Sequence, residues 1–343
     1  MKISTHVGYW GSGPPAEAPE LFAAADRLRL DQIWTAEAYG SDAWTPLAWW
    51  GSRTSHVHLG TAISQLSARP PATLAMAAMT MDHLTGGRVL IGIGTSNPQV
   101  VEGWYGQPYP RPLERTREYV DILRAIIARE GPVVYDGKHY QLPLAGGTGL
   151  GKPLRSILHP YRPEMPVYLG AEGPRNVALA AEIADGWLTM FFSPSMNDFY
   201  AAALAEGFAR PGARHTSASF DVVGGPMRIV VDDDTERAAD VLRPSLALYI
   251  GGMGARGVNY HHEVFARMGY ETQAAVIQDR YLAGDRKGAI AAVPTSMVED
   301  VALIGPWAKI ADEIQRWRQT VLTTFSVSTD LRHLAAVVEL LRG

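Results

Sequence analysis

Short apolar runs with strand character alternate with helical segments along nearly the whole chain. Helical spacing of apolar residues marks 19–28, 72–84, 113–129, a segment that starts at Pro174, and a closing helix over 331–341. Strand signals lie at 3–9, 32–36, 58–64, 89–93, 167–169, 188–192, 220–231 and 323–327. Eight such β/α units predict an α/β protein with a closed (β/α)8 architecture, a TIM barrel.

Two stretches interrupt this alternation. Residues 133–142 carry a hairpin signal around Asp136-Gly137, and the glycine-rich GGTGLG that follows indicates a flexible loop. The seventh strand is broken at Gly224-Gly225-Pro226, which suggests a bend or bulge, and a helical insertion follows over about 234–293. We therefore expect one barrel domain over 1–343, with insertions after strands four and seven.

A doubly wound open sheet is the competing architecture. It places a G-x-G-x-x-G nucleotide turn in its first β/α unit, and the segment 8–13 does not contain that pattern. The barrel is therefore the favoured fold.

Composition narrows the function classes. The 343 residues are 47% hydrophobic, carry a net charge of −4, and show no dense Lys/Arg cluster that would favour nucleic-acid binding. There is no cysteine, which excludes disulfides, thiolate metal sites and cysteine nucleophiles. His56-Val57-His58 precedes a strand and falls on the stability face, so we expect no metal site. Without a signal-peptide pattern or a bilayer-length apolar run, the sequence predicts a cytoplasmic protein that needs no membrane.

The segment 166–187, PVYLGAEGPRNVALAAEIADGW, is the most informative motif. A short strand enters a glycine-bearing turn, and Pro174 fits the first position of the helix that follows. Glycine lets the backbone approach a ligand, and free N–H groups at a helix start attract an anion. We expect a phosphate to bind here, although an ordinary β/α connection is the alternative. The candidate residues are Gly170, Ala171, Glu172, Gly173, Pro174 and Arg175.

The other strand ends supply aromatic and small residues and one carboxylate, which suits a flat aromatic ligand with a phosphate tail. Glu37 is a candidate for ring contact or proton transfer, with Tyr39 and His6 as alternative donors; His6 could equally be a core histidine. We expect Tyr9, Trp10 and Phe191 to line a substrate pocket. Gly251 to Arg256 in the insertion is a candidate lid.

With these residues in place, the chain resembles the bacterial-luciferase-like flavin and deazaflavin oxidoreductases, and more narrowly their coenzyme F420-dependent branch. The resemblance rests on ARPP, LTGGRVLIGIG and LGAEGPR at this spacing, and matching pieces run nearly end to end. It implies a luciferase-like barrel, usually paired into homodimers through its early helices. It also implies hydride transfer between F420 and a small organic substrate.

The same resemblance implies how the cofactor lies. A bulge after strand three with a non-prolyl cis peptide, here Ala62-Ile63, would press on the back of the ring. The phosphate would meet the N–H groups of Glu172 and Gly173, with Gly94, Thr95 and Ser96 near the tail. Some relatives carry an acid followed by histidine after strand two, whereas here Ala38 follows Glu37. That departure argues against sugar-phosphate dehydrogenase activity.

Three other functions stay open at this stage. An FMN-dependent monooxygenase that works with a separate flavin reductase is the close alternative. A Schiff-base lyase or aldolase ranks low because none of the five lysines lies at a strand end. A non-catalytic cofactor carrier would bind deazaflavin without turnover.

Overall fold

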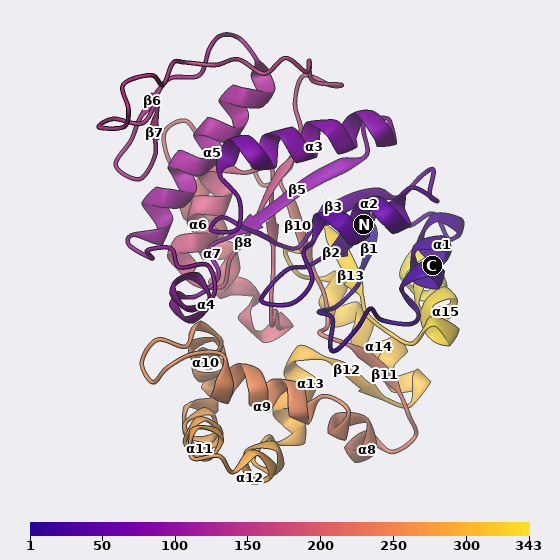
Figure 1. Cartoon of the computed structure of the whole chain (residues 1–343). Helices are drawn as coiled ribbons and strands as arrows, with labels where there is room; N and C mark the ends of the chain where they lie inside the picture. The colour runs from indigo at the N-terminus through magenta and orange to yellow at the C-terminus, as the bar shows by residue number, and fades with distance from the viewer.

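The computed structural model describes all 343 residues, and eight parallel strands close a barrel at its centre (Figure 1). Their order is β3-β2-β1-β13-β10-β9-β8-β5, and β5 pairs back with β3, so no barrel edge is open. This confirms the predicted TIM barrel. The strands are β1 (Lys2–His6), β2 (Gln32–Thr35), β3 (His58–Thr61), β5 (Val89–Gly94), β8 (Val167–Gly170), β9 (Gly186–Leu188), β10 (Asp221–Gly224) and β13 (Thr324–Val327).

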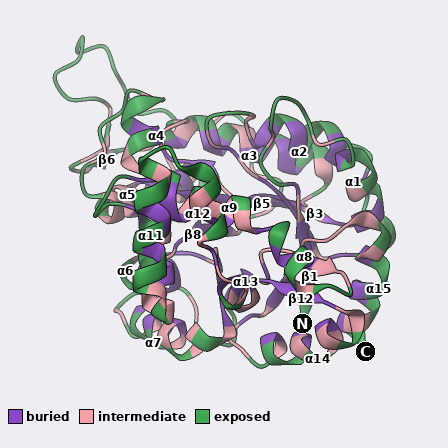
Figure 2. Ribbon diagram, turned by 90° about the horizontal axis from the view of Figure 1, so that it is seen from below, coloured by how far each residue is buried: buried purple, intermediate pink, exposed green.

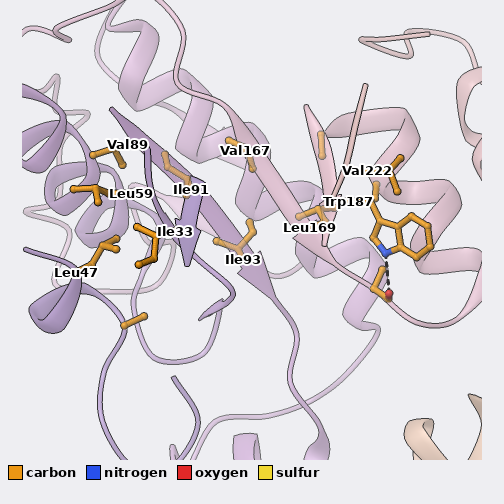
Figure 3. Close-up of a cluster of buried hydrophobic side chains, with 14 of the residues drawn as sticks. Ile33, Leu47, Leu59, Val89, Ile91, Ile93, Val167, Leu169, Trp187 and Val222 are labelled. Atoms are coloured by element: carbon orange, nitrogen blue, oxygen red, sulfur yellow. Dashed lines mark hydrogen bonds between the residues drawn. The ribbon is translucent and has the colours of Figure 1, made fainter. Parts of the chain in front are cut away.

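Side chains alternate between the two faces of these strands, so each strand contributes to two cores. The outward residues Ile91, Ile93, Val167 and Leu169 join a cluster of 58 buried residues beneath the helices (Figure 3). A separate cluster fills the barrel lumen and consists of Trp34, Leu90, Tyr168, Leu188 and Val223. Because both faces are buried, the strands read as nearly continuous apolar runs in the sequence.

Glycines make room for the aromatic side chains inside the barrel. A Cβ on Gly60 would lie 2.3 Å from the Trp34 ring, and one on Gly186 would lie 2.3 Å from the Tyr168 ring. The indole and phenol rings meet edge to face with centroids 5.2 Å apart. Small residues on one strand thus accommodate large ones on its neighbour, which gives the lumen a solid aromatic floor.

Helices cover the outside of the barrel. The predicted ones appear within about two residues of their expected bounds as α1 (Ala18–Arg27), α3 (Pro71–Thr85), α5 (Pro112–Ala128), α6 (Pro174–Ile183) and α15 (Leu331–Arg342). Further covering helices are α7 (Asn197–Phe208) and α14 (Trp307–Arg318). Both α3 and α6 begin with a proline, and Gly86 ends α3 with a φ of 70°, a left-handed cap that favours glycine.

The structure differs from the predicted elements in two places. After β2, Trp44–Gly51 forms helix α2, which was not predicted, and Asp42 caps it by accepting the N–H groups of Trp44 and Thr45. The sixth barrel strand is Gly186–Leu188 rather than 188–192. The backbone leaves the extended conformation soon after it, and Phe191 has a φ of 51°.

The insertion after β5 contains α4 (Pro98–Gly103), α5 and the predicted hairpin, formed by β6 (Tyr135–Asp136) and β7 (Gln141–Leu142). After β10 the expected seventh strand proves to be two strands. Its second half, β11 (Ile229–Val231), leaves the barrel and pairs in parallel with β12 (Leu303–Gly305).

Six helices lie between β11 and β12, with a core of 18 buried residues that includes Phe191 from the barrel rim. They are α8 (Thr235–Asp240), α9 (Arg243–Gly252), α10 (Tyr260–Phe265), α11 (Glu271–Leu282), α12 (Arg286–Ala291) and α13 (Thr295–Val301). Seen from below, these helices lie across one end of the barrel (Figure 2). The insertion is therefore slightly longer than predicted. None of the helices in the chain is long and apolar enough to cross a bilayer.

Candidate functional site

A cavity of about 1270 Å³ lies at the carboxyl ends of the barrel strands, between the barrel and helices α9 and α10. This is the end at which parallel barrels place ligands, because the loops that follow the strands converge there. Most of the residues predicted from the sequence line it. They are His6, Tyr9, Glu37, Ala62, Ile63, Gly94, Thr95, Ser96, Gly170, Ala171, Glu172, Gly173, Pro174, Arg175 and Phe191.

Two predicted residues are not part of the cavity wall. Trp10 packs against the outer core instead, with its ring centroid 5.7 Å from that of Trp50. Tyr39 is 53% exposed, and its hydroxyl lies 4.0 Å from the Sδ of Met253. This geometry does not support the expected pocket role of Trp10 or the proton-donor role of Tyr39, and both stay predictions. A position just after a strand places a residue near the mouth of the barrel. It does not determine where the side chain points when the loop is irregular.

The floor of the cavity is formed at the bulge after β3. The peptide between Ala62 and Ile63 is cis, as the resemblance implies, and the chain re-enters the sheet at β4 (Ser64–Gln65). The Ile63 side chain lies against two glycines at neighbouring strand ends. A Cβ on Gly94 would be 3.0 Å from the Cγ1 of Ile63, and a Cβ on Gly170 would be 2.8 Å from its Cγ2. The two glycines therefore set how low Ile63 can lie.

Glu37 anchors this bulge from below. Its Oε1 accepts hydrogen bonds from the Ser64 hydroxyl at 3.0 Å and the Gln65 N–H at 2.7 Å. Nη1 of Arg69 lies 2.8 Å from both carboxylate oxygens, and the Ala43 N–H reaches Oε2 at 3.2 Å. Because both oxygens of this 3% exposed side chain are already occupied, the geometry favours an anchoring role. Its catalytic role stays a prediction.

The turn between β8 and α6 presents unused backbone donors to the cavity. The N–H groups of Glu172, Gly173 and Arg175 donate no hydrogen bond within the protein, and Pro174 has none to offer. The turn is held from behind by the Trp187 indole, whose Nε1 donates to the Ala171 carbonyl at 2.8 Å (Figure 3). These donors lie at the first turn of a ten-residue helix, where the helix dipole also favours an anion.

Neighbouring groups extend this anion-binding character. The N–H groups of Thr95 and Ser96 likewise have no partner in the protein, and the Tyr109 hydroxyl fixes this loop by donating to the Ser96 carbonyl at 2.9 Å. Arg175 is exposed and forms no ion pair. Its guanidinium is therefore free for a negatively charged ligand.

A side-chain pair joins the turn to the insertion. Nδ1 of His261, on α10, lies 2.9 Å from Oε1 and 3.0 Å from Oε2 of Glu172. The imidazole ring also packs edge to face on Tyr249 and Phe191, with centroids 5.0 Å and 5.5 Å apart. Sequence reasoning missed this contact because 89 residues separate its partners.

His6 occupies the opposite side of the cavity, at the end of β1. Burial, and to a lesser degree the positive charge of Arg228, lower the pKa of His6 below its ordinary value of 6.5. The imidazole is therefore neutral at neutral pH, and no hydrogen bond to another protein group occupies it. Arg228, which also lines the cavity and was not predicted, is bound to Asp330 at 2.5 Å. A neutral imidazole without hydrogen-bond partners can donate a proton to a bound ligand or accept one from it.

Comparison with known proteins agrees with this geometry. Residues 2–324 match the family model described as luciferase-like monooxygenase. The chain is 49% identical to a putative coenzyme F420-dependent oxidoreductase of Mycobacterium tuberculosis, over 98% of this chain and 99% of the relative.

Two solved structures share the fold. The F420-dependent tetrahydromethanopterin reductase of Methanopyrus kandleri superposes with a TM-score of 0.76 at 23% identity, over 99% of this chain and 97% of the other. An F420-dependent secondary alcohol dehydrogenase, solved with an F420–acetone adduct, also gives 0.76, at 17% identity over 100% and 99%. The match to the family model and the 49% identical relative decide the assignment: the chain belongs to the luciferase-like monooxygenase family.

Proposed function

We propose that this protein is an oxidoreductase that transfers a hydride between coenzyme F420 and a small organic substrate. The observation that carries the proposal is the cavity floor, where Ile63 rests on Gly94 and Gly170 beside the unpartnered N–H groups of Glu172 and Gly173. A flat ring needs the apolar floor that Ile63 forms, and a phosphate tail needs the free N–H groups of the turn. The 49% identical relative and both structural neighbours are described as F420-dependent, which supports F420 in particular.

The residues present fit this cofactor. A cavity of about 1270 Å³ exceeds the usual size of a small-ligand pocket, so it has room for a tricyclic ring, its tail and a substrate together. The ring would lie over Ile63, the tail would point to Thr95 and Ser96, and the phosphate would be held by the turn before α6. When bound, F420 would supply or accept the hydride at C5 of its deazaflavin ring.

The protein then provides position and proton transfer. Ile63 would set the height of the ring, and Glu37 with Arg69 keeps the bulge that carries Ile63 in place. His6, neutral and without a protein partner, lines the cavity and could exchange a proton with a bound substrate. Phe191 and Tyr249 close the cavity from the insertion side and keep water out.

Titration of the purified protein with F420 and with FMN, followed by fluorescence, tests the proposal. We expect F420 to bind in the micromolar range or tighter and FMN to bind more weakly. Binding of FMN alone, with substrate oxidation only in the presence of a flavin reductase, would establish the monooxygenase alternative instead. Saturable binding of F420 without turnover for any carbonyl or alcohol would leave a cofactor carrier.

The proposal includes assembly into a homodimer in the cytoplasm. Large apolar side chains are exposed on the early helices: Trp49 on α2 is 65% exposed and Met76 on α3 is 62% exposed. Such residues support an interface with a second copy. Light scattering coupled to size-exclusion chromatography should give about twice the mass of one chain. In Trp49→Glu the measured mass should fall to that of one chain.

A further inference from the structure

The turn that offers N–H groups to a phosphate also carries a carboxylate, that of Glu172. The N–H of Glu172 is itself one of the unpartnered donors. The Glu172 carboxylate therefore lies no farther from that donor than the length of one side chain. It is held there: His261 Nδ1 contacts both oxygens at 2.9 Å and 3.0 Å, and the Glu172 side chain is only 13% exposed. A negative charge is thus built into the proposed phosphate site.

Other carboxylates of the cavity do not share this position. Glu37 is neutralised by Arg69 beneath the floor. Glu17 also lines the cavity, but it follows β1, which lies diametrically opposite β8 in the strand order of the barrel. Glu172 is therefore the carboxylate that a phosphate at this turn would meet.

The attraction available at the turn is limited. It comes from the partial positive charge of the α6 N-terminus, from the exposed Arg175, and from whatever charge His261 carries. A phosphate monoester carries between one and a half and two negative charges near neutral pH, whereas a diester carries one. Each further unit of negative charge repels the Glu172 carboxylate in a partly buried site, where such repulsion is only weakly screened.

We propose that the Glu172 carboxylate, held in place by His261, makes this site select cofactors with a phosphodiester over those with a phosphomonoester. The inference rests on the proposed function, because it assumes that the cofactor phosphate lies at this turn. The phosphate of F420 is a diester and that of FMN is a monoester. One side chain would therefore separate the two cofactors that a luciferase-like barrel could hold.

The test isolates the phosphate charge from the ring. Dissociation constants at pH 8 are measured for FMN, for its methyl ester (a diester with the same ring) and for riboflavin, each by displacement of bound F420. We expect the wild-type protein to bind the methyl ester about tenfold more tightly than FMN. In Glu172→Gln this ratio should fall to about one, because the amide keeps an acceptor for His261 without the charge.

Two controls make the result specific. Riboflavin should bind Glu172→Gln and the wild type equally, and Glu17→Gln should keep the wild-type ratio because it removes the same charge across the barrel. A ratio of one in the wild type, which needs no variant, overturns the inference, as does an unchanged ratio in Glu172→Gln. Failure of the wild type to bind F420 at all overturns the proposed function itself, so the two failures are distinguishable.

Discussion

Arg69 holds Glu37 with a single nitrogen, Nη1, which lies 2.8 Å from both carboxylate oxygens beneath the bulge that carries Ile63. The pair is largely removed from solvent, with the Glu37 side chain 3% exposed and that of Arg69 19% exposed. Arg69 reaches further to Asp42, the residue that caps α2, at 3.4 Å. This contact ties the floor of the site to the first helix after β2.

Arg69→Ala should lower the free energy of unfolding by about 3–5 kcal/mol, because it leaves the Glu37 carboxylate buried without its counter-charge. Urea denaturation measures this. The matched control is Arg111→Ala, which removes an arginine from the exposed Arg111–Glu114 pair and should change stability little, because solvent screens both charges. If both variants lose the same free energy of unfolding, the buried Glu37–Arg69 pair contributes no more to stability than an exposed pair.

Gly170→Ala should weaken F420 binding at least about tenfold while changing stability little. The added methyl group would lie 2.8 Å from the Cγ2 of Ile63, so Ile63 must rise into the space of the ring. Gly103→Ala, at the end of α4 and outside the cavity wall, is the control, because no atom lies within 4 Å of its Cβ position. If the two variants bind the cofactor equally well, Ile63 does not set the height of the ring.

Removing one N–H from the turn tests the phosphate contact directly. Gly173 has a φ of −81°, which proline can adopt, so Gly173→Pro deletes the donor and keeps the φ of this residue. A hydrogen bond to a charged group contributes about 1.5–3 kcal/mol. F420 should therefore bind to Gly173→Pro about ten- to a hundredfold more weakly than to Gly173→Ala. The deazaflavin without its phosphate should bind both variants alike. A loss of the same size for that compound would place the phosphate elsewhere.

His6 should make the folded protein sensitive to acid. Its pKa in the folded state is lowered by burial and then by Arg228, so between that value and 6.5 the unfolded chain binds more protons than the folded one. Stability is therefore complete above about pH 6.5 and declines as the pH falls below it. We expect wild-type protein to lose more unfolding free energy between pH 7.5 and pH 5.5 than His6→Asn does, measured by urea denaturation. Identical losses would mean that the pKa of His6 is the same in the folded and the unfolded protein.

Local patterns were enough to predict most of the barrel. Strand and helix periods are properties of neighbouring residues, and both faces of each strand are buried here, so the apolar runs stand out. The segment Trp44–Gly51 was missed because its helix is stabilised by burial of Trp44 and Leu47 and by the Asp42 cap rather than by strong helix formers. The break at 224–226 was visible in the sequence, but the departure of β11 to pair with β12 was not.

The sequence by itself determined the order of β/α units and the turn at 170–175, because each depends on residues close together in the chain. The bulge at Ala62-Ile63 was implied only by the family resemblance. Only the tertiary structure decided which side chains meet at the cavity. It turned Trp10 toward Trp50, used both oxygens of Glu37 on Arg69 and its neighbours, and brought His261 to Glu172. These contacts join residues far apart in the chain, so they depend on how whole elements pack and not on any local pattern.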